Sequence, residues 1–314
     1  MKYTVLFLFV LLFAAGITLG FLGRNVVFVK NSAGGNFPIA IKTPEPEKTL
    51  LILGDIMLGR HVEVLMDKNG EDYPFEKISG LLKGADLVFA NLEGPIVNDH
   101  QRTPELSTFF SFKSSIATLL KKYNIGVVSL ANNHLLDQGK IGLQDAKDLL
   151  ALASVAYTGD PTTIDADNIF YTKLGNANLA LIGFNATWPS FDKVKAFNLI
   201  KSVKTASPDK FVIVYLHWGE EYQVKSNAAQ KALSHEMIDA GADLIVGSHP
   251  HVVQDEETYK DKRVFYSLGN FIFDQYFSKE VQTGRAIRVK FSGGSVSYET
   301  IPYVSKLSQP QPVL

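Results

Sequence analysis

The chain has 314 residues, enough for one large domain or two small ones. Hydrophobic residues make up 46% of the sequence, which excludes a disordered protein. The net charge is −1 and no strongly basic stretch occurs, so the sequence argues against a nucleic-acid-binding surface. Because the sequence contains no cysteine, disulfides, zinc–thiolate sites and thiol nucleophiles are excluded, and any metal must be held by His, Asp, Glu or Asn.

The N-terminal segment 3–23 is almost wholly apolar, and the first charge after it is Arg24. About 20 such residues span the hydrocarbon core of a membrane, whereas the apolar part of a cleavable signal has ~7–15 residues. We therefore expect residues 1–24 to form an uncleaved anchor rather than a removed signal peptide. Residues 25–48, rich in Gly, Pro, Lys and Glu, are the expected linker. The expected location is the cell membrane, with a single pass through the lipid bilayer and the domain facing the outside.

Short apolar runs alternate with amphipathic stretches along the rest of the chain. This order is typical of βαβ units with a sheet that is at least partly parallel, so we expect an α/β domain over 49–304 and a loose tail over 305–314. Alternation about a turn also predicts antiparallel hairpins within 156–187 and 285–303. The apolar runs are 49–53, 86–90, 126–130, 211–216, 243–246 and 264–268, and the helical stretches are 75–83, 114–123, 139–152, 193–204 and 227–240.

Several apolar runs end in side chains that bind metals. Because the carboxyl ends of parallel strands lie at one edge of a sheet, we expect these side chains to converge. Carboxylate, amide and imidazole together suit Mn²⁺, Fe²⁺ or Zn²⁺, and a carboxylate with histidines on both sides suits a pair of ions. Each residue alone is also a common turn former or helix cap, so only the whole set predicts a site. The residues are Asp55, Glu93, Asn133, His134, His217, His249 and His251.

The clearest of these strand ends is 241–254, GADLIVGSHPHVVQ. We expect Gly247 to let the backbone turn after a buried strand, and Pro250 to fix φ between His249 and His251. Alone, the motif is also compatible with two surface histidines on a turn.

Six motifs together resemble the signatures of the CapA/PgsA proteins of bacterial capsule and poly-γ-glutamate synthesis, a family of the calcineurin-like metallophosphoesterase superfamily. In chain order they are LLILGDIMLGR, NLEGPI, SLANNHLLDQG, LHWGEEY, GADLIVGSHPHVVQ and YSLGNFIFD. The resemblance covers residues 49–291 and implies a four-layer α/β/β/α sandwich on a membrane anchor. It also implies a role in making, exporting or tethering an anionic cell-envelope polymer such as poly-γ-glutamate, together with membrane synthase or export subunits.

The resemblance assigns a role to each motif residue. Met57 stands where the superfamily has a second histidine ligand, and Glu93 stands where it has a bridging Asp. A thioether is a poor ligand for such ions, so the number of bound metals, one or two, is left open. His61 is either a substitute ligand or a solvent-facing residue at the start of a helix. By the resemblance, His134 protonates the leaving oxygen or stabilises charge, and the metal ligands are Asp55, Glu93, Asn133, His217, His249 and His251.

Further polar residues near the strand ends are candidates for supporting roles. Arg60 either pairs with an anionic substrate, which would make it part of the catalytic machinery, or forms a structural salt bridge. Trp218 and Phe271 either line the pocket or pack in the core, and Asn132 is interpreted as a turn residue. The candidates for substrate contact or for support of the ligands are Asn91, His61, Glu220, Glu221 and Asn270.

Two classes of function follow from these features. The first is an enzyme, a metal-dependent hydrolase or transferase that uses activated water on a phosphoryl or amide linkage of the polymer, or else a generic phosphoesterase. The second is a non-catalytic accessory subunit, in which the pocket only binds polymer and the anchor docks it to a membrane synthase.

Overall fold

The structure, a computed structural model, describes residues 20–21, 26–30, 36–40 and 46–313. Contacts divide the chain into two units, Met1–Pro46 and Glu47–Leu314. Most of the expected anchor, 1–24, lies outside the described residues, and so does much of the expected linker, 25–48. In the described part of the chain, no helix is both long enough and apolar enough to cross a membrane. The first unit contains a small antiparallel sheet of β1 (Gly20–Phe21), β2 (Val26–Lys30) and β3 (Asn36–Ala40), so strands occupy part of the expected linker.

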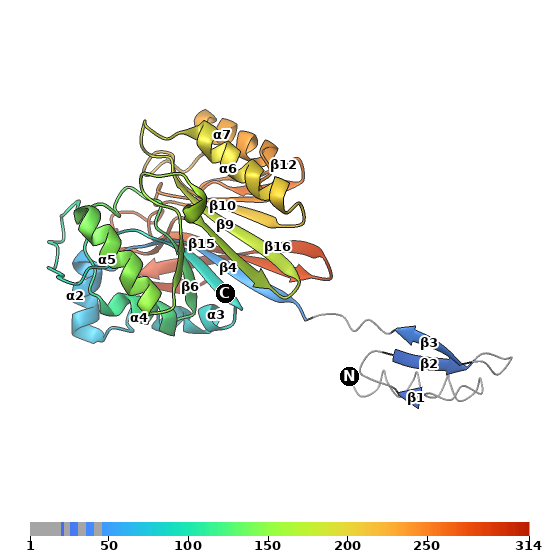
Figure 1. Cartoon of the computed structure of the whole chain (residues 1–314). Helices are drawn as coiled ribbons and strands as arrows, with labels where there is room; N and C mark the ends of the chain where they lie inside the picture. Colours follow the sequence, from blue (N-terminus) through green and yellow to red (C-terminus); the bar gives the residue numbers. More distant parts are fainter. Residues whose placement is uncertain (1–19, 22–25, 31–35, 41–45, 314) are drawn as a thin grey trace. The chain divides into compact units, whose positions relative to one another are not determined.

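The second unit is built on two β-sheets (Figure 1). The first has the order β17-β16-β15-β4-β5-β6-β7, with β14 beside β4, and β4 to β7 run parallel. Its strands are β4 (Lys48–Ile56), β5 (Leu87–Leu92), β6 (Ile125–Ser129), β7 (Ala156–Thr158), β14 (Asn270–Ile272), β15 (Thr283–Ser292), β16 (Ser295–Lys306) and β17 (Gln309–Pro312).

The second sheet has the order β12-β13-β11-β10-β9-β8, with its four central strands parallel. Its strands are β8 (Ile169–Leu174), β9 (Ala177–Asn185), β10 (Phe211–His217), β11 (Leu244–Ser248), β12 (Glu256–Tyr259) and β13 (Lys262–Phe265). The helices of the unit are α2 (Arg60–Asn69), α3 (Ser79–Lys83), α4 (Ser115–Lys122), α5 (Gly139–Leu152), α6 (Lys193–Ala206) and α7 (Ala228–Asp239), with short 3-10 turns η1 (Glu76–Ile78) and η2 (Ala166–Asn168).

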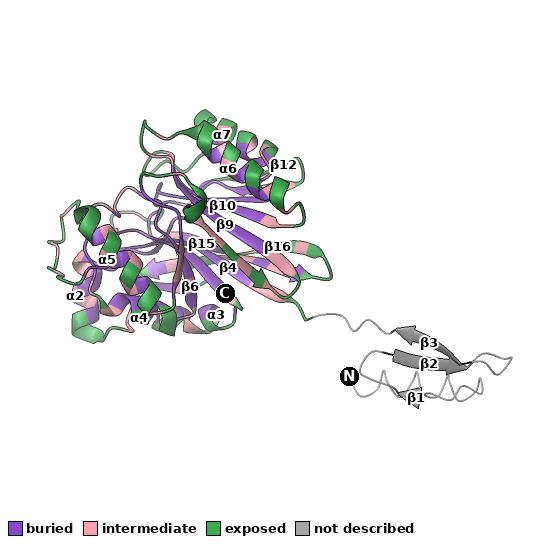
Figure 2. Ribbon diagram, in the orientation of Figure 1, coloured by how far each residue is buried: buried purple, intermediate pink, exposed green. Residues whose placement is uncertain are grey.

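Three apolar cores define the layers. In β4, Leu50 and Ile52 enter a core shared with the second sheet, while Leu51 and Leu53 enter a core shared with α2 to α5. The third core joins the other face of the second sheet to α6 and α7. This alternation follows from the two-residue period of a strand that is covered on both faces. Figure 2 shows that the strands are largely buried and that the helices are exposed on their outer sides. The expected α/β class is confirmed.

Both predicted hairpins are present, as β8–β9 and β15–β16. The expected loose tail is wrong for residues 305–313, because β17 pairs with β16 across the turn Leu307-Ser308. Both turn residues have positive φ, 47° and 61°, as a two-residue hairpin turn requires, but neither is the Gly or Asn that signals such a turn.

The expected role of Gly247 is also wrong. β11 continues through Gly247 to Ser248, so the chain does not turn there. A Cβ on Gly247 would lie 2.0 Å from the Tyr266 carbonyl oxygen, so this glycine permits close packing of the strand. The turn comes at the two histidines that follow.

Candidate metal centre

The carboxyl ends of the parallel strands of both sheets bring ionisable side chains together. β4 carries Asp55, Glu93 follows β5, and β10 ends at His217. All three side chains are fully buried. A buried charge costs free energy unless it is paired or binds a cation, so such a grouping calls for a partner.

Asn91, near the end of β5, links these groups. Its Nδ2 donates to Asp55 Oδ1 at 2.8 Å and to Glu93 Oε2 at 3.3 Å, and lies 3.4 Å from His217 Nδ1. Asn132 in turn donates to Asn91 Oδ1 at 3.0 Å and to the Leu92 carbonyl at 2.8 Å. Asn132 is therefore a buried part of the network rather than only a turn residue.

The two histidines after β11 adopt a backbone conformation that L-residues rarely take. His249 has φ 94° and His251 has φ 59°. Such left-handed backbone costs free energy and clusters at functional sites. The conformation turns the His249 amide towards Asp55 Oδ2, at 3.3 Å, and sets His251 Nδ1 3.4 Å from the same oxygen and His251 Nε2 3.6 Å from Glu93 Oε1. The same His251 Nδ1 also lies 3.0 Å from Asn270 Oδ1.

Burial dominates the electrostatics of the cluster. Burial, together with the nearby charge of Asp55, raises the pKa of Glu93 well above its usual value. Burial by itself would also raise the pKa of Asp55. The hydrogen bonds from His251, Asn91 and the His249 amide outweigh burial, so the pKa of Asp55 is lowered. Burial lowers the pKa of His217 well below its usual value and that of His249 to about 4, with the neighbouring imidazoles adding to the effect.

The residues fit a divalent cation. Two buried atoms in the cluster, Glu93 Oε1 and His249 Nδ1, have no hydrogen-bond partner. Ligand atoms of Asp55, Glu93 and His251 lie within 4.8 Å of one another, as do those of Glu221, His249 and His251. Polar atoms without a hydrogen-bond partner at this depth are costly, and a bound cation would satisfy their lone pairs. The mixture of carboxylate and neutral imidazole is suited to Mn²⁺, Fe²⁺ or Zn²⁺.

Comparison with known proteins identifies the family of the chain. Residues 49–275 match the model of a family described as bacterial capsule synthesis protein PGA_cap. The chain belongs to this family. It is 33% identical over 293 residues to the capsule biosynthesis protein CapA of Bacillus anthracis, covering 87% of this chain and 71% of that protein. It is 31% identical over 277 residues to the PGA biosynthesis protein CapA of Bacillus subtilis, covering 83% of this chain and 72% of the relative.

Among solved structures, a hypothetical protein from Thermus thermophilus is similar in fold, with a TM-score of 0.56 and 17% identity. The match covers 84% of this chain and 100% of that one. At this identity the likeness concerns the fold alone.

In this PGA_cap chain, the loop after β6 closes one wall of the cluster. Asn133 Oδ1 lies 2.7 Å from His217 Nε2, so these two expected ligands contact each other. His134 Nδ1 lies 2.8 Å from Asp137 Oδ2, and its Nε2 lies 4.0 Å from Glu93 Oε1. The Phe110 ring packs on His134 with ring centroids 4.1 Å apart. The loop thus holds the imidazole beside the carboxylates.

Three residues near the first motif point away from the cluster or are engaged elsewhere. Arg60 forms an ion pair with Asp274 and donates to the Ser107 carbonyl at 3.0 Å. His61 Nδ1 lies 2.8 Å from Glu105 Oε1, outside the two groups of ligand atoms. Met57 is fully buried in the core beneath α2 to α5, where its sulfur accepts the Gly59 N–H at 3.2 Å.

Of the remaining candidates, two lie in the cores, one is exposed and one supplies a possible ligand atom. Trp218 stacks on Tyr266 in the core beneath α6 and α7, and Phe271 packs on Tyr303, so both are core residues. Glu220 is exposed, whereas its neighbour Glu221 supplies a ligand atom near His249 and His251.

The sequence interpretation missed three residues that hold the proposed site residues in place. Asp137 lies three positions after His134, a spacing that brings two side chains together in a turn and was a usable signal. Ser248 directly precedes His249, and its Oγ lies 3.0 Å from His217 Nδ1. Asp274 ends the motif YSLGNFIFD, but its partner Arg60 lies 214 positions away in sequence, so the motif did not show the pairing.

Proposed function

We propose that the cluster binds at least one divalent transition-metal ion, and that the domain is a metal-dependent hydrolase of phosphoryl or amide linkages in a cell-envelope polymer. The observation that carries this proposal is the pair of buried, unpartnered atoms Glu93 Oε1 and His249 Nδ1 beside Asp55. A chain gains nothing in stability from burying such atoms, so a ligand is the simplest reason for them.

Asp55, Glu93 and His251 would hold the ion, with His249 and Glu221 able to complete its shell or to hold a second ion. Asn133 and His217, now joined to each other, are the adjoining donors. A bound ion of this kind polarises a phosphoryl or carbonyl oxygen and lowers the pKa of water. Asn91 fixes the orientation of the Asp55 carboxylate, because its amide donates to one carboxylate oxygen.

His134 is the proposed proton donor to the leaving oxygen. Asp137 accepts a hydrogen bond from Nδ1, so Nε2 is the atom left to hold and release the transferred proton on the Glu93 side. Phe110 covers one face of the ring and limits its access to bulk water.

For the biological role, we propose capsule or poly-γ-glutamate synthesis, export or tethering at the outer face of the cell membrane. Family membership and the two CapA relatives support this role, and the apolar segment 3–23 supports a single-pass anchor that meets synthase or export subunits in the bilayer. The two facing sheets with outer helices support a metallophosphoesterase-like α/β/β/α sandwich.

The direct test is the metal content of the full-length chain, purified in detergent without chelators. We expect stoichiometric Mn, Fe or Zn, lost in Asp55→Ala and retained in Asp209→Ala, a fully exposed carboxylate that serves as the matched control. Hydrolysis of a generic phosphodiester or γ-linked amide should vanish with Asp55→Ala and with chelator. Metal-free protein whose function survives His249→Ala would overturn the proposal.

One observation favours a non-catalytic accessory role as the second candidate. Met57 is packed in the core and gives no ligand where the resembled superfamily has a histidine. In that case the Asp55→Ala variant would still restore γ-linked polyglutamate secretion to Bacillus subtilis that lacks its CapA relative. Chelator-sensitive turnover by the unmodified chain would exclude this second candidate.

A further inference from the structure

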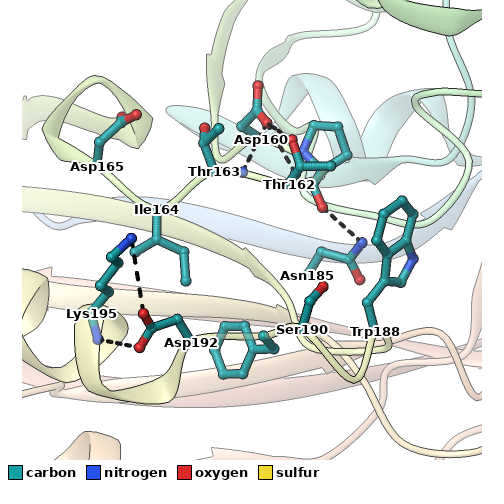
Figure 3. Close-up of a pocket in the computed structure, with 12 residues that line it drawn as sticks. Asp160, Thr162, Thr163, Ile164, Asp165, Asn185, Trp188, Ser190, Asp192 and Lys195 are labelled. Carbon is teal, nitrogen blue, oxygen red and sulfur yellow. Dashed lines mark hydrogen bonds and ion pairs between the residues drawn. The ribbon is translucent and has the colours of Figure 1, made fainter.

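A groove of about 480 Å³ opens between the loops that follow β7 and β9 (Figure 3). It adjoins the metal cluster along the carboxyl edge of the second sheet. Asn185, which lines the groove, pairs in register with the cluster residue His217, and the Ala186 N–H donates to the His217 carbonyl at 2.8 Å. The groove is therefore a neighbouring pocket on the same edge, formed by residues that the metal chemistry does not use.

The walls of the groove are fixed by internal hydrogen bonds. Asp160, 8% exposed, accepts from the Thr162 and Thr163 amides at 3.0 and 3.1 Å and pairs with Lys147 at 3.0 Å. Asn185, 7% exposed, donates to the Pro161 carbonyl at 3.2 Å. A pocket with such supports keeps its shape before a ligand arrives, which lowers the entropic cost of binding.

The groove has an aromatic side and a carboxylate side. Figure 3 shows Trp188 and Asn185 on one side and Asp165, Asp192 and Lys195 on the other. The Trp188 side chain is 37% exposed, unusual for an indole, whereas Trp218 is fully buried. An exposed indole in a pocket offers a flat apolar face to a ring, and the opposite side offers carboxylate oxygens that accept hydrogen bonds.

The charges limit what can bind. Three carboxylates line the groove, Asp160, Asp165 and Asp192, against two cations: Lys195, which lies 3.9 Å from Asp192, and Lys147, which pairs with Asp160 from outside the lining. A polymer with a carboxylate on every residue would meet like charge in this groove. Hydroxyl groups are the complementary ligands, since Thr162, Ser190 and the carboxylates can each take part in hydrogen bonds to them.

We propose that this groove binds a saccharide that carries no anionic group, either neutral or amine-bearing, with one sugar ring stacked on Trp188. The groove would then hold a glycan beside the metal cluster, while the anionic polymer is handled elsewhere. This proposal goes beyond the function proposed above and does not depend on it, because saccharide binding should be unchanged in Asp55→Ala.

Tryptophan fluorescence gives a direct test, because the sequence has only two tryptophans and one of them is buried in the core. The full-length chain, in a detergent without a sugar head group, is titrated with cello-, chito- and chitosan oligosaccharides and with poly-γ-glutamate oligomers. We expect a saturable change in emission at millimolar saccharide, confirmed by calorimetry. By calorimetry, which does not need the Trp188 reporter, Trp188→Ala should weaken the binding about tenfold or more, and Val194→Ala, an exposed residue outside the lining, should not.

A second variant, which replaces two lining carboxylates with amides, tests the class of saccharide that binds. Asp165→Asn with Asp192→Asn should retain saccharide binding, because amides also bond hydroxyls, while weakening any preference for the amine-bearing oligosaccharide. The proposal is overturned if no oligosaccharide binds, if binding is unchanged in Trp188→Ala, or if poly-γ-glutamate competes for Trp188. Loss of metal from Asp55→Ala with intact saccharide binding would separate the two proposals.

Discussion

The core between the two sheets and the candidate metal cluster are built by the same strands but meet opposite requirements. In β10, Ile213 is fully buried in the core between the sheets, and four residues later His217 is fully buried in the cluster. The core is apolar throughout, so burial there stabilises the fold. The cluster buries two carboxylates and three imidazoles with two atoms unpartnered, so burial there costs stability. The fold holds the cluster in place because the cores supply the stability that the cluster lacks.

Removing core volume should have the largest effect on stability. Ile213→Ala leaves a cavity between tightly packed sheets and should lower the free energy of unfolding by about 2–5 kcal/mol, measured by denaturant titration. Metal bound per folded chain should stay unchanged, because Ile213 is not in the cluster. A fall in metal stoichiometry in the folded variant would contradict the separation of the two regions.

Acid should weaken the metal-free protein through His249. The pKa of this residue is lowered to about 4 in the folded chain by burial, against 6.5 ordinarily, so the unfolded chain binds the proton first. Stability therefore falls as the pH drops from about 6.5 towards 4, and it is fully present above that window. The loss amounts to about 3 kcal/mol, at 1.36 kcal/mol for each unit of pKa.

The measurement compares the unmodified chain with His249→Gln in chelator, by urea unfolding at a series of pH values. The raised pKa of Glu93 acts in the opposite sense above its ordinary value, since the folded chain then keeps a proton that the unfolded chain releases. This contribution is common to both proteins and cancels in the difference. An equal pH dependence in both would show that His249 is not buried in its neutral form.

The sequence predicted the strands and the convergence of their ends because both depend on local patterns. Apolar runs with a terminal Asp or His, such as those before Asp55 and His217, identify a buried strand and the residue at its carboxyl end. The pattern could not show which partners the side chains that follow a strand would contact. His61 is directed to Glu105 and Arg60 to Asp274, partners that tertiary contacts select over 44 and 214 positions of sequence.

The sequence patterns also did not predict the positions where the backbone has positive φ, because packing rather than local sequence sets them. The positive φ of His249 and His251 is held by the surrounding packing, and neither position is the glycine that most often signals it. The same holds for Leu307 and Ser308, whose hairpin turn joins β17 to the first sheet.

Neutralising Glu93 should stabilise the metal-free chain. Glu93→Gln removes a carboxyl group that must take up a proton when the chain folds, because burial raises its pKa. The free energy of unfolding at neutral pH should therefore rise by about 1–2 kcal/mol in chelator, while metal affinity falls. Glu63 is the matched control, since it is also buried, 3% exposed, but lies within 3.1 Å of His100 and 3.4 Å of Arg102 and Lys113. Glu63→Gln should destabilise the chain instead. Equal signs for the two variants would mean that Glu93 is a structural residue.

The smallest expected effect concerns Phe110, which packs on His134 from the core beneath α2 to α5 and lies 4.9 Å from the Arg60 guanidinium. Phe110→Leu retains apolar bulk but removes the flat face, so it should lower the free energy of unfolding by only about 0.5–1.5 kcal/mol. Phe109→Leu, at a 59% exposed neighbour, should leave stability nearly unchanged. If Phe110 also fixes the His134 ring, turnover should fall by more than the stability loss explains while metal content is retained. Unaltered turnover in Phe110→Leu would leave Asp137 as the residue that positions the imidazole.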